Sequence, residues 1–398
     1  MGAGASGLMA AAMVASPGTG VLVLDQNDRP GAKLSLTGGG RCNILPAAAD
    51  PSAYVTSSSR NSLAKILRGW SPGEARSFFA REAGVGIEPE AATGKLFAVP
   101  GGAPAVTGAL EGIAKRAGAV FRYRSRVSGI SPSERGWTVS LECGESVESD
   151  RVVLATGGRS WPGTGSGGWG FAEAARLGHT VRPVYPALVP LLSGDPGFGS
   201  LSGIVVEATI SSVFEGRPFS VRGPLLFTHR GFSGPVVMDA SHASTGPRTA
   251  ALSVSWGGLD RKAWEEVLLA GRGLVRKALE PHLPSRLAGL IVERAGLDPS
   301  IRFADLAREG RMSLLAVLSA CPLPVSGNCG WDEAEVTGGG VALEEVDPAS
   351  LESRLHPGLH FAGEVLDAFG PVGGCNLYWA WLTGRLSAGA RRPRNPSP

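Results

Sequence analysis

Residues 358–384, near the end of the chain, read GLHFAGEVLDAFGPVGGCNLYWAWLTG. Leu359–Ala362 has the composition of a short buried strand, and the glycines after it predict a loop. Asn376–Leu386 predicts a helix that is apolar almost all round. The first N–H groups of a helix have no acceptors within it. A strand followed by glycines and a buried helix therefore predicts a binding site for a negatively charged group.

The opposite end of the chain carries a second such pattern. Gly2-Ala-Gly-Ala-Ser-Gly7 has the GxGxxG spacing, residues 8–15 predict a helix, and Val21–Leu24 predicts a buried strand. Asp25 follows that strand, where a dinucleotide-binding fold places the carboxylate that contacts the adenosine ribose. One elongated ligand that touches both ends of the chain would explain both patterns. We therefore predict a dinucleotide with its pyrophosphate at the first glycines and its redox ring near Gly374.

The same fold needs a strand of about five residues before the first glycine. Only Met1 precedes Gly2 in this sequence. In the common strand order this strand is central, so its absence would leave a gap beside the ligand. We therefore expect that the start of the chain is truncated or wrongly assigned.

Two internal segments are also suited to contact a ligand. Residues 28–43 read DRPGAKLSLTGGGRCN, in which consecutive glycines permit close backbone approach. Within it, Lys33 and Arg41 could neutralise pyrophosphate, and Asn43 could bond a ring or a ribose. Residues 152–158 read VVLATGG, a buried strand that ends at glycines.

Gly163–Gly168 also has the GxGxxG spacing, which raises the question of a separate NAD(P) site. The pattern does not leave a strand directly, and the strand expected at 179–184 carries no acid at its end. We therefore predict one dinucleotide fingerprint and no additional nicotinamide domain.

Composition narrows the class of protein. The net charge is +3 over 398 residues, which implies no nucleic-acid partner, and no apolar run reaches the roughly 18 residues of a membrane span. Five cysteines without a CxxC pair favour the reducing cytoplasm. The 58 glycines indicate many tight turns and close backbone approaches.

The order of predicted elements divides the chain. Ser71-Pro72 predicts the start of the second helix in a pair at 60–84, and a further helix is expected near 104–117. Strands at 122–130, 137–143 and 151–155 predict a β-meander. We expect a dinucleotide-binding domain at 1–190 and 331–390, an inserted β-barrel-like subdomain at 191–256, an inserted helical subdomain at 257–330, and a disordered tail at 391–398.

Together these motifs resemble the BaiN-like flavoproteins, also described as aminoacetone-oxidase-type or NAD(P)/FAD-dependent oxidoreductases. The matching pieces are GAGASG at the start, LSLTGGGRCN at 34–43, VVLATGGRSWPGTGS at 152–166, PALVPL at 186–191, LLFTHRGFSGP at 225–235 and FAGEVLDAFGPVGGCNLYWAWLTG at 361–384. The resemblance implies an α/β fold, in which a Rossmann-like FAD-binding domain (parallel sheet plus β-meander) is interrupted by an inserted β-barrel and helical unit. It also implies FAD as cofactor, a small organic substrate, and NAD(P)H as a candidate transient co-substrate.

Under this interpretation the cofactor contacts residues from both ends and from the middle of the chain. These are Gly2, Gly4, Ala5, Ser6, Gly7, Asp25, Gln26, Lys33, Gly39, Gly40, Arg41, Cys42, Asn43, Val127, Ala155, Thr156, Gly157, Gly158, Gly363, Glu364, Gly373, Gly374, Asn376 and Leu377. We expect Val127 to bring backbone against adenine, Cys42 to lie beside the ring, and a Cβ at Gly373 or Gly374 to collide with it.

His229 is the candidate acid or base, because histidine titrates near neutrality; the alternative is a structural histidine. The alternative to an enzyme is a non-catalytic or degenerate flavin-binding protein. The sequence does not predict the oligomeric state.

Overall fold

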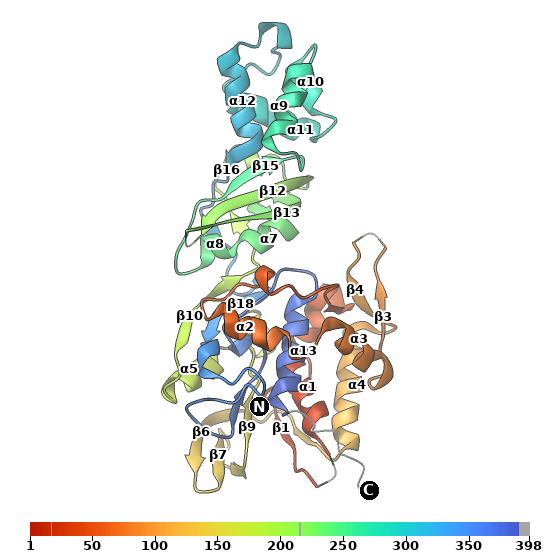
Figure 1. Cartoon of the computed structure of the whole chain (residues 1–398), viewed down its shortest axis with the longest axis vertical. Coiled ribbons are helices and arrows are strands. Elements are labelled where there is room, and N and C mark those ends of the chain that lie inside the picture. Colours follow the sequence, from red (N-terminus) through yellow and green to blue (C-terminus); the bar gives the residue numbers. More distant parts are fainter. Residues whose placement is uncertain (17, 92, 215, 390–398) are drawn as a thin grey trace. The chain divides into compact units, whose positions relative to one another are not determined.

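The computed structural model describes residues 1–16, 18–91, 93–214 and 216–389. It divides into two compact units, Met1–Val184 with Val336–Pro398 and Tyr185–Glu335 (Figure 1). Each unit has its own core of buried apolar side chains. We expected domain limits at 190/191 and 330/331, and the compact units meet at 184/185 and 335/336. The tail expected at 391–398 lies outside the described residues.

The first unit is built on parallel strand pairs. β1 (Leu22–Leu24) pairs with β5 (Val120–Arg122), and β9 (Val152–Leu154) pairs with β19 (Leu359–Phe361). Met1 lies beside β9, because its amino group donates to Val153 O at 2.8 Å and its carbonyl accepts from Ala155 N at 2.9 Å. Gly2 N donates to Leu24 O at 2.8 Å. Met1 and Gly2 therefore lie between the two pairs, at the place of a central strand.

Three helices pack close to these strands. α1 (Ala5–Val14) contacts both α13 (Cys375–Ser387) and α4 (Gly102–Arg116). A Cβ on Gly384 of α13 would fall on Ser6 O and lie 3.0 Å from the Met9 Cβ, so a glycine is needed where α1 and α13 meet. α13 is buried on nearly every side, as its apolar composition predicts.

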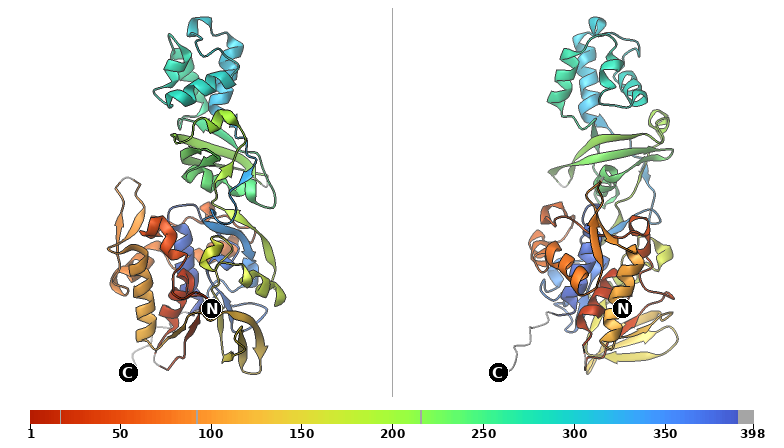
Figure 2. Two further views of the ribbon diagram at one scale, coloured as in Figure 1. Left: turned by 180° about the vertical axis from the view of Figure 1, so that it is seen from behind. Right: turned by 90° about the vertical axis from the view of Figure 1, so that its right-hand side faces the viewer.

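The remaining elements of the first unit cover this centre (Figure 2). The Ser71 cap is confirmed: its side chain and Glu74 form a capping box at the start of α3. The other bounds are β2 (Asn43–Leu45), β3 (Gly86–Pro89), β4 (Leu96–Val99), α2 (Arg60–Leu67), α3 (Pro72–Arg81), α5 (Trp169–Arg176), β10 (Val181–Ala187), β18 (Val336–Val341), and the short 3-10 turns η1 (Leu34–Gly40), η2 (Pro51–Ala53), η3 (Pro162–Thr164), η5 (Leu343–Glu345) and η6 (Gly363–Val365). β2, β4 and β3 form one antiparallel sheet, and β10 pairs with β18.

The β-meander is present, but its third strand differs from the prediction. It consists of β6 (Val127–Ser133), β7 (Gly136–Leu141) and β8 (Ser146–Ser149), paired antiparallel in that order. Residues 151–155, expected as the third strand, instead contain β9 of the parallel sheet. The reason is their burial: Val152 and Leu154 are apolar and buried, whereas alternate positions of β8 are exposed.

The second unit contains one seven-stranded antiparallel sheet in the order β16-β15-β12-β13-β14-β11-β17. A flat sheet of this size would be about 29 Å wide. One edge strand, β16, ends at Pro322, and the opposite edge strand, β17, begins at Gly327. The five residue steps of chain between these two positions span at most about 18 Å. The sheet is therefore curved rather than flat, and the barrel-like form of this subdomain stays a prediction. The strands are β11 (Leu191–Leu192), β12 (Val205–Phe214), β13 (Arg217–Thr228), β14 (Gly231–Ser233), β15 (Ser253–Trp256), β16 (Cys321–Pro322) and β17 (Gly327–Asn328).

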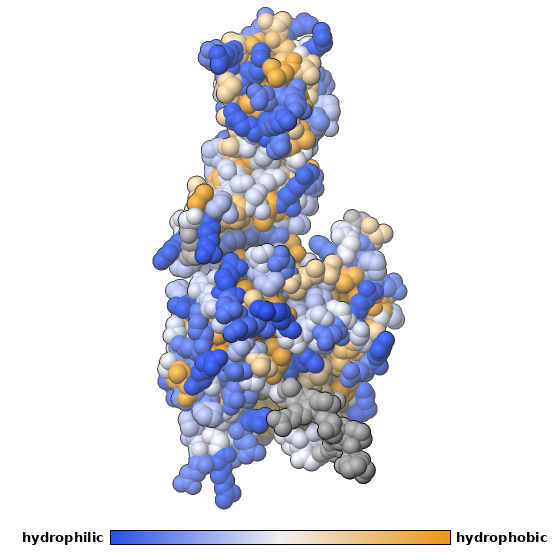
Figure 3. All heavy atoms as spheres, viewed as in Figure 1, coloured by the Kyte–Doolittle hydropathy of each residue, from blue (hydrophilic) through white to orange (hydrophobic). Residues whose placement is uncertain are grey.

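The helices of the second unit share its apolar core with the sheet. Trp256 of β15 and Trp264 of α9 are fully buried, and Trp264 Nε1 donates to Trp256 O at 3.0 Å. The bounds are α6 (Pro196–Gly199), α7 (Pro235–Ala240), α8 (His242–Thr245), α9 (Arg261–Ala270), α10 (Val275–Leu279), α11 (Ser285–Arg294), η4 (Phe303–Asp305) and α12 (Arg308–Ala320). Hydrophobic residues are scattered among hydrophilic ones on the face drawn in Figure 3. Among the described residues, no helix is long and apolar enough to cross a membrane.

Candidate functional site

The glycines at the start of α1 have different physical roles. A Cβ on Gly2, which has φ +95°, would fall on Ala155 O, and a Cβ on Gly7 would fall on Gly2 O. Both glycines are therefore required by packing within the protein. Gly4 is the N-cap, has no side-chain cap, and a Cβ there would meet nothing within 4 Å. The first-turn N–H groups, those of Ala5, Ser6 and Gly7, thus begin beside open space.

Asp25 ties the end of β1 to this turn. Its Oδ2 accepts from Ala3 N at 2.6 Å and its Oδ1 from Asn27 N at 2.8 Å. A carboxylate oxygen accepts more than one hydrogen bond, so Asp25 keeps capacity for a ribose hydroxyl. Gln26 is exposed and donates to Gly165 O at 2.5 Å. Val127 begins β6 and is half-buried.

Side chains of residues 33–43 bond to other residues of the protein. Lys33 is paired with Glu364, with 2.6 Å between Nζ and Oε2, rather than being a free cation. Arg41 is largely exposed, pairs with Glu90 at 2.6 Å and lies over the Phe97 ring, so its charge is used at the β3–β4 hairpin. Both residues therefore have carboxylate partners within the protein, and their contact with pyrophosphate stays a prediction.

Asn43 and Cys42 also make contacts within the protein. With its amide oriented to satisfy both neighbours, Asn43 donates to Leu96 O at 3.0 Å and accepts from Gly374 N at 3.2 Å, which joins β2 to the start of α13. Its contact with a ring or ribose stays a prediction. Cys42 is fully buried in the apolar core, and burial raises the pKa of its thiol to about 12. Gly39 and Gly40 lie in the half-exposed part of the loop with φ of +65° and +86°.

The ends of β9 and β19 meet around Glu364. Its Oε1 accepts from Ser160 Oγ and from Thr337 N, both at 2.8 Å, and Lys33 also contacts Ser160. A Cβ on Gly158 would lie 2.5 Å from this carboxylate, so Gly158 permits the cluster to form. Glu364 therefore has three partners within the protein, although the sequence suggested a flavin or ribose contact.

The other residues predicted after β9 lie close by. Ala155 is buried and bonded to Met1, and Gly157 has φ +70°. Thr156 Oγ1 is buried and has no hydrogen-bond partner among the described residues. Gly363 lies against α1, because a Cβ there would be 2.5 Å from Ser6 Oγ.

The start of α13 is fixed by hydrogen bonds. Asn376 Oδ1 accepts from Gly370 N and its Nδ2 donates to Gly370 O, both at 2.9 Å. Gly374 has φ +92°, and a Cβ there would lie 2.6 Å from the Leu45 carbonyl, whereas a Cβ on Gly373 would meet nothing within 4 Å. The protein's own backbone therefore requires glycine at 374, and the expected collision with a ring stays a prediction. The N–H groups of Asn376 and Leu377 lie in the first turn, where the helix provides no acceptor.

The two predicted ends of the site lie on one pair of packed helices. Ser6 of α1 contacts Gly384 of α13, and Gly384 is about 14 Å along the helix from Cys375. An extended ligand can thus begin at the N-terminus of α1 and end at that of α13. The open space at Gly4 and two helix N-termini without side-chain caps fit a molecule with a central pyrophosphate and an anionic ring edge, as in FAD.

Of the predicted site residues, His229 alone lies in the second unit. His229 is exposed in the turn between β13 and β14. The neighbouring Arg230 pairs with Glu333 at 2.8 Å. His229 therefore remains a candidate.

Sequence patterns missed Ser160 and Thr337, which complete the Lys33–Glu364 cluster. Ser160 stands two residues after the VVLATGG motif, so its position was a usable signal. Thr337 lies in β18 outside any motif that we identified, and only the pairing of distant segments brings it to Glu364.

The fold and the site together define an FAD-dependent oxidoreductase of the Rossmann type. The family model of the HI0933-like protein Rossmann domain matches residues 1–390. The chain belongs to this family, which confirms the resemblance drawn from the motifs.

Similar proteins cover nearly the whole chain. It is 32% identical to the ribosomal RNA dihydrouridine synthase of Escherichia coli (strain K12), over 96% of this chain and 94% of that protein. It is 31% identical to the 3-dehydro-bile acid delta(4,6)-reductase of Clostridium scindens, over 99% of this chain and 98% of that protein. A solved 3-ketosteroid-delta4-(5alpha)-dehydrogenase from Rhodococcus jostii RHA1 matches 98% of this chain and 96% of its own, with 16% identity and a TM-score of 0.48.

Proposed function

We propose that this oxidoreductase reduces a carbon–carbon double bond conjugated to a carbonyl group in a small organic substrate, with NAD(P)H as electron donor. FAD supplies the two-electron transfer when it is bound. The chemistry shared by two relatives supports this reaction. A dihydrouridine synthase adds two hydrogens to uridine, and a delta(4,6)-reductase of a 3-dehydro compound reduces double bonds conjugated to its ketone.

The start of α13 is the structural feature that best supports a reductive role. Its first-turn N–H groups and the positive end of its dipole favour negative charge nearby, typically by about 0.3–2 kcal/mol. Asn376 holds the Gly370 loop and Asn43 holds Gly374, so these donors are fixed in place. Donors fixed in advance stabilise developing charge better than mobile ones, because they need no reorganisation during the reaction.

Reduction of the double bond also requires a proton, and His229 is our candidate donor. It is an exposed histidine in the turn between β13 and β14, and histidine is the side chain that most often transfers protons in catalysis. The variant His229→Gln is expected to slow reoxidation of the enzyme by substrate while leaving reduction by NAD(P)H unchanged. If His229→Gln shows the wild-type rate in both half-reactions, His229 is not the proton donor.

The deciding experiment is anaerobic and has two stages. NADH or NADPH is first added to the flavin-loaded protein, and loss of the flavin absorption reports reduction. A 4-en-3-one steroid is then added, and we expect the absorption to return together with a product heavier by two hydrogens. Reduced protein that is reoxidised by dioxygen but by no conjugated carbonyl compound would refute the proposal. Bleaching by an amine instead of NAD(P)H would indicate an amine oxidase.

The same chemistry on uridine is the second candidate, because the relative from Escherichia coli is 32% identical over almost the whole chain. The net charge of +3 provides little attraction for a polyanion, which is why we favour the small substrate. Unmodified ribosomal RNA added in the second stage, followed by analysis of its nucleosides for dihydrouridine, distinguishes the two.

A further inference from the structure

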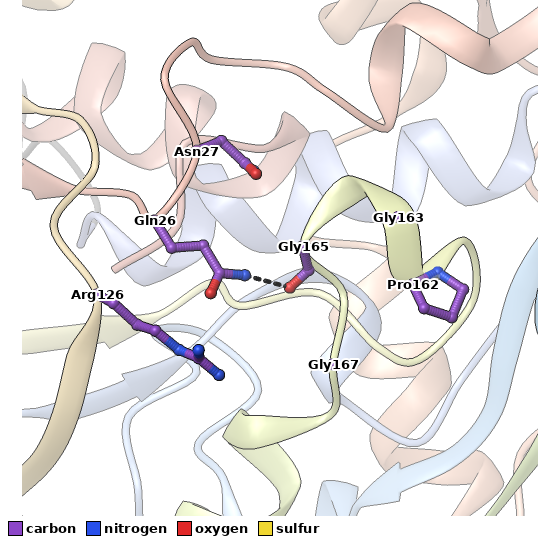
Figure 4. A pocket seen from close by; sticks show the side chains of 7 residues that line it. All are labelled: Gln26, Asn27, Arg126, Pro162, Gly163, Gly165 and Gly167. Carbon is purple, nitrogen blue, oxygen red and sulfur yellow. Dashed lines mark hydrogen bonds between the residues drawn. The ribbon is translucent and has the colours of Figure 1, made fainter. Parts of the chain in front are cut away.

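The two ends of the candidate cofactor site are held in different ways. At the end expected to hold adenosine, Gln26 Nε2 donates to Gly165 O at 2.5 Å beside a pocket of about 470 Å³ (Figure 4). At the other end, residues 366–374 form the loop that leads into α13, and three of these nine residues are glycines. We call these nine residues the ring-end loop. Glycine has no side chain with which to hold a loop, so its position depends on contacts from elsewhere in the chain.

Asp367 is the side chain through which the ring-end loop is held at its start. It is 1% exposed. Its Oδ2 accepts from Ser58 Oγ at 2.7 Å and from Ser57 N at 3.0 Å, and Thr56 Oγ1 donates to Asp367 O at 2.6 Å. Burial raises the pKa of Asp367, while its bonds with Ser58 and its neighbours act in the opposite direction. A buried carboxylate is costly without such donors, so three consecutive residues and Asp367 hold one another in place.

The same segment reaches the ring-end loop at two further points. Val55 N donates to Phe369 O at 2.8 Å, and Phe369 N donates to Val55 O at 3.1 Å. Tyr54 is fully buried, and its hydroxyl donates to Cys375 O, in the first residue of α13, at 3.2 Å. We call residues 54–58 the latch segment. It therefore contacts the ring-end loop near its start and middle, and α13 at its first residue.

The latch segment is itself fixed to the body of the first unit. Leu343 N donates to Ser58 Oγ at 3.1 Å, and Arg60 Nη1 donates to Tyr54 O at 2.6 Å. The next residue, Ser59, is the N-cap of α2. The latch segment thus has its own anchors at both ends, and it can serve as a support for the ring-end loop.

We propose that Asp367 and the latch segment position the redox-ring end of the site, because they fix the ring-end loop and with it the first-turn N–H groups of α13. Asp367 needs no contact with flavin or substrate for this role, so it is a positioning residue. Donors that are fixed before the reaction stabilise developing charge better than mobile ones. The inference rests on FAD as the cofactor and is independent of the substrate proposed above.

The test uses one probe for each end of the site, on the full chain. Sulfite adds reversibly to the oxidised flavin ring and gives an anionic product, so its affinity reports the positive end of α13. Adenosine diphosphate lacks the ring, and its affinity for the deflavinated protein reports the other end.

Two variants remove the bonds of Asp367 from opposite sides. The double variant Thr56→Val with Ser58→Ala removes both hydroxyl donors, and Asp367→Leu removes the acceptor. In each we expect sulfite affinity to fall about fivefold while the affinity for adenosine diphosphate stays unchanged. Asp367→Asn keeps an acceptor oxygen and should lose no sulfite affinity. Ser77→Ala is the matched control, because this exposed serine bonds only Gly73 O within its own helix, and it should change neither affinity.

Four results would overturn the inference. The first is wild-type sulfite affinity in the double variant, which decides alone if Asp367→Leu does not fold. The second is an equal loss of affinity for sulfite and for adenosine diphosphate, which would make the latch segment a general structural element. The third is as large a loss in Asp367→Asn as in the double variant, which would assign the effect to charge. The fourth is wild-type protein that binds adenosine diphosphate but no FAD, which would reject the cofactor and this inference with it.

Discussion

Lys33 Nζ lies 2.6 Å from Glu364 Oε2, and this ion pair joins the loop after β1 to the end of β19. Both side chains are mostly buried, at 25% and 18% exposure. Ser160 and Thr337 bond the same carboxylate, so four separate segments are joined at one point beside the proposed cofactor path. The cofactor contacts of Lys33 and Glu364 stay predictions beside these bonds.

Removing the lysine should therefore destabilise the first unit. Lys33→Met leaves Glu364 without its cation, and we expect the free energy of unfolding to fall by about 1–3 kcal/mol. Glu364→Gln in the same chain should restore part of the loss, since no buried charge then lacks a partner. Urea unfolding of the four proteins of this double-mutant cycle measures the coupling, and strictly additive effects would contradict it.

The two neighbouring glycines before α13 should respond differently to substitution. Gly374→Ala forces a Cβ against the Leu45 carbonyl in addition to the strain of φ +92°, so we expect more than about 2 kcal/mol of destabilisation. Gly373→Ala has open space and only the strain of φ +117°, for about 1 kcal/mol. Urea unfolding checks the order, and equal losses would show that the Leu45 contact does not matter.

Cys42 should be chemically inert in the folded protein. Burial raises the pKa of its thiol to about 12, although a hydrogen bond with Thr37 acts in the opposite direction. At about pH 8 almost no thiolate is present to react. Iodoacetamide followed by peptide mass spectrometry should label the exposed Cys143 and leave Cys42 unmodified until the protein is unfolded. Rapid labelling of native Cys42 would contradict its placement in the core.

Buried His179, which bonds Glu345 and Ser353, should make the free energy of unfolding smaller in acid. Burial lowers the pKa of His179, while its bond to Glu345 at 2.9 Å acts in the opposite direction. An unfolded histidine titrates near pH 6.5. Below that pH the unfolded chain takes up a proton that the folded chain resists, so the free energy of unfolding falls as pH falls. His179→Gln should show a smaller drop between about pH 7.5 and 5.5 than wild type, and an equal drop in urea unfolding of the two proteins would contradict this prediction.

The backbone elements near the site could be predicted because their signals are local. Apolar runs identified β1, β9 and β19, and the glycine turn and the largely apolar 376–386 segment identified α1 and α13. The assignment of 151–155 to the meander failed, because alternation and continuous burial are hard to tell apart over five residues.

The partners of polar side chains could not be predicted in the same way. Lys33 and Glu364 are 331 positions apart in sequence, and Asn43 reaches Gly374 across a similar separation. Only the fold brings such residues together, so a lysine beside glycines looked like a phosphate contact. Sequence reasoning identified the segments of the site, but not which side chains bond to one another.

Gly4 gives the most direct test of whether α1 begins at a cofactor site. A Cβ at Gly4 meets no protein atom within 4 Å, whereas one at Gly7 falls on Gly2 O. Gly4→Val should therefore lower the urea midpoint of the deflavinated protein only by the small cost of valine at an N-cap, and Gly7→Val should lower it much further. The decisive measurement is the dissociation constant of FAD for Gly4→Val by flavin fluorescence. We predict that it rises more than about tenfold, because the added methyl groups occupy the space of the pyrophosphate. A stable Gly4→Val protein that binds FAD as tightly as wild type would contradict the account.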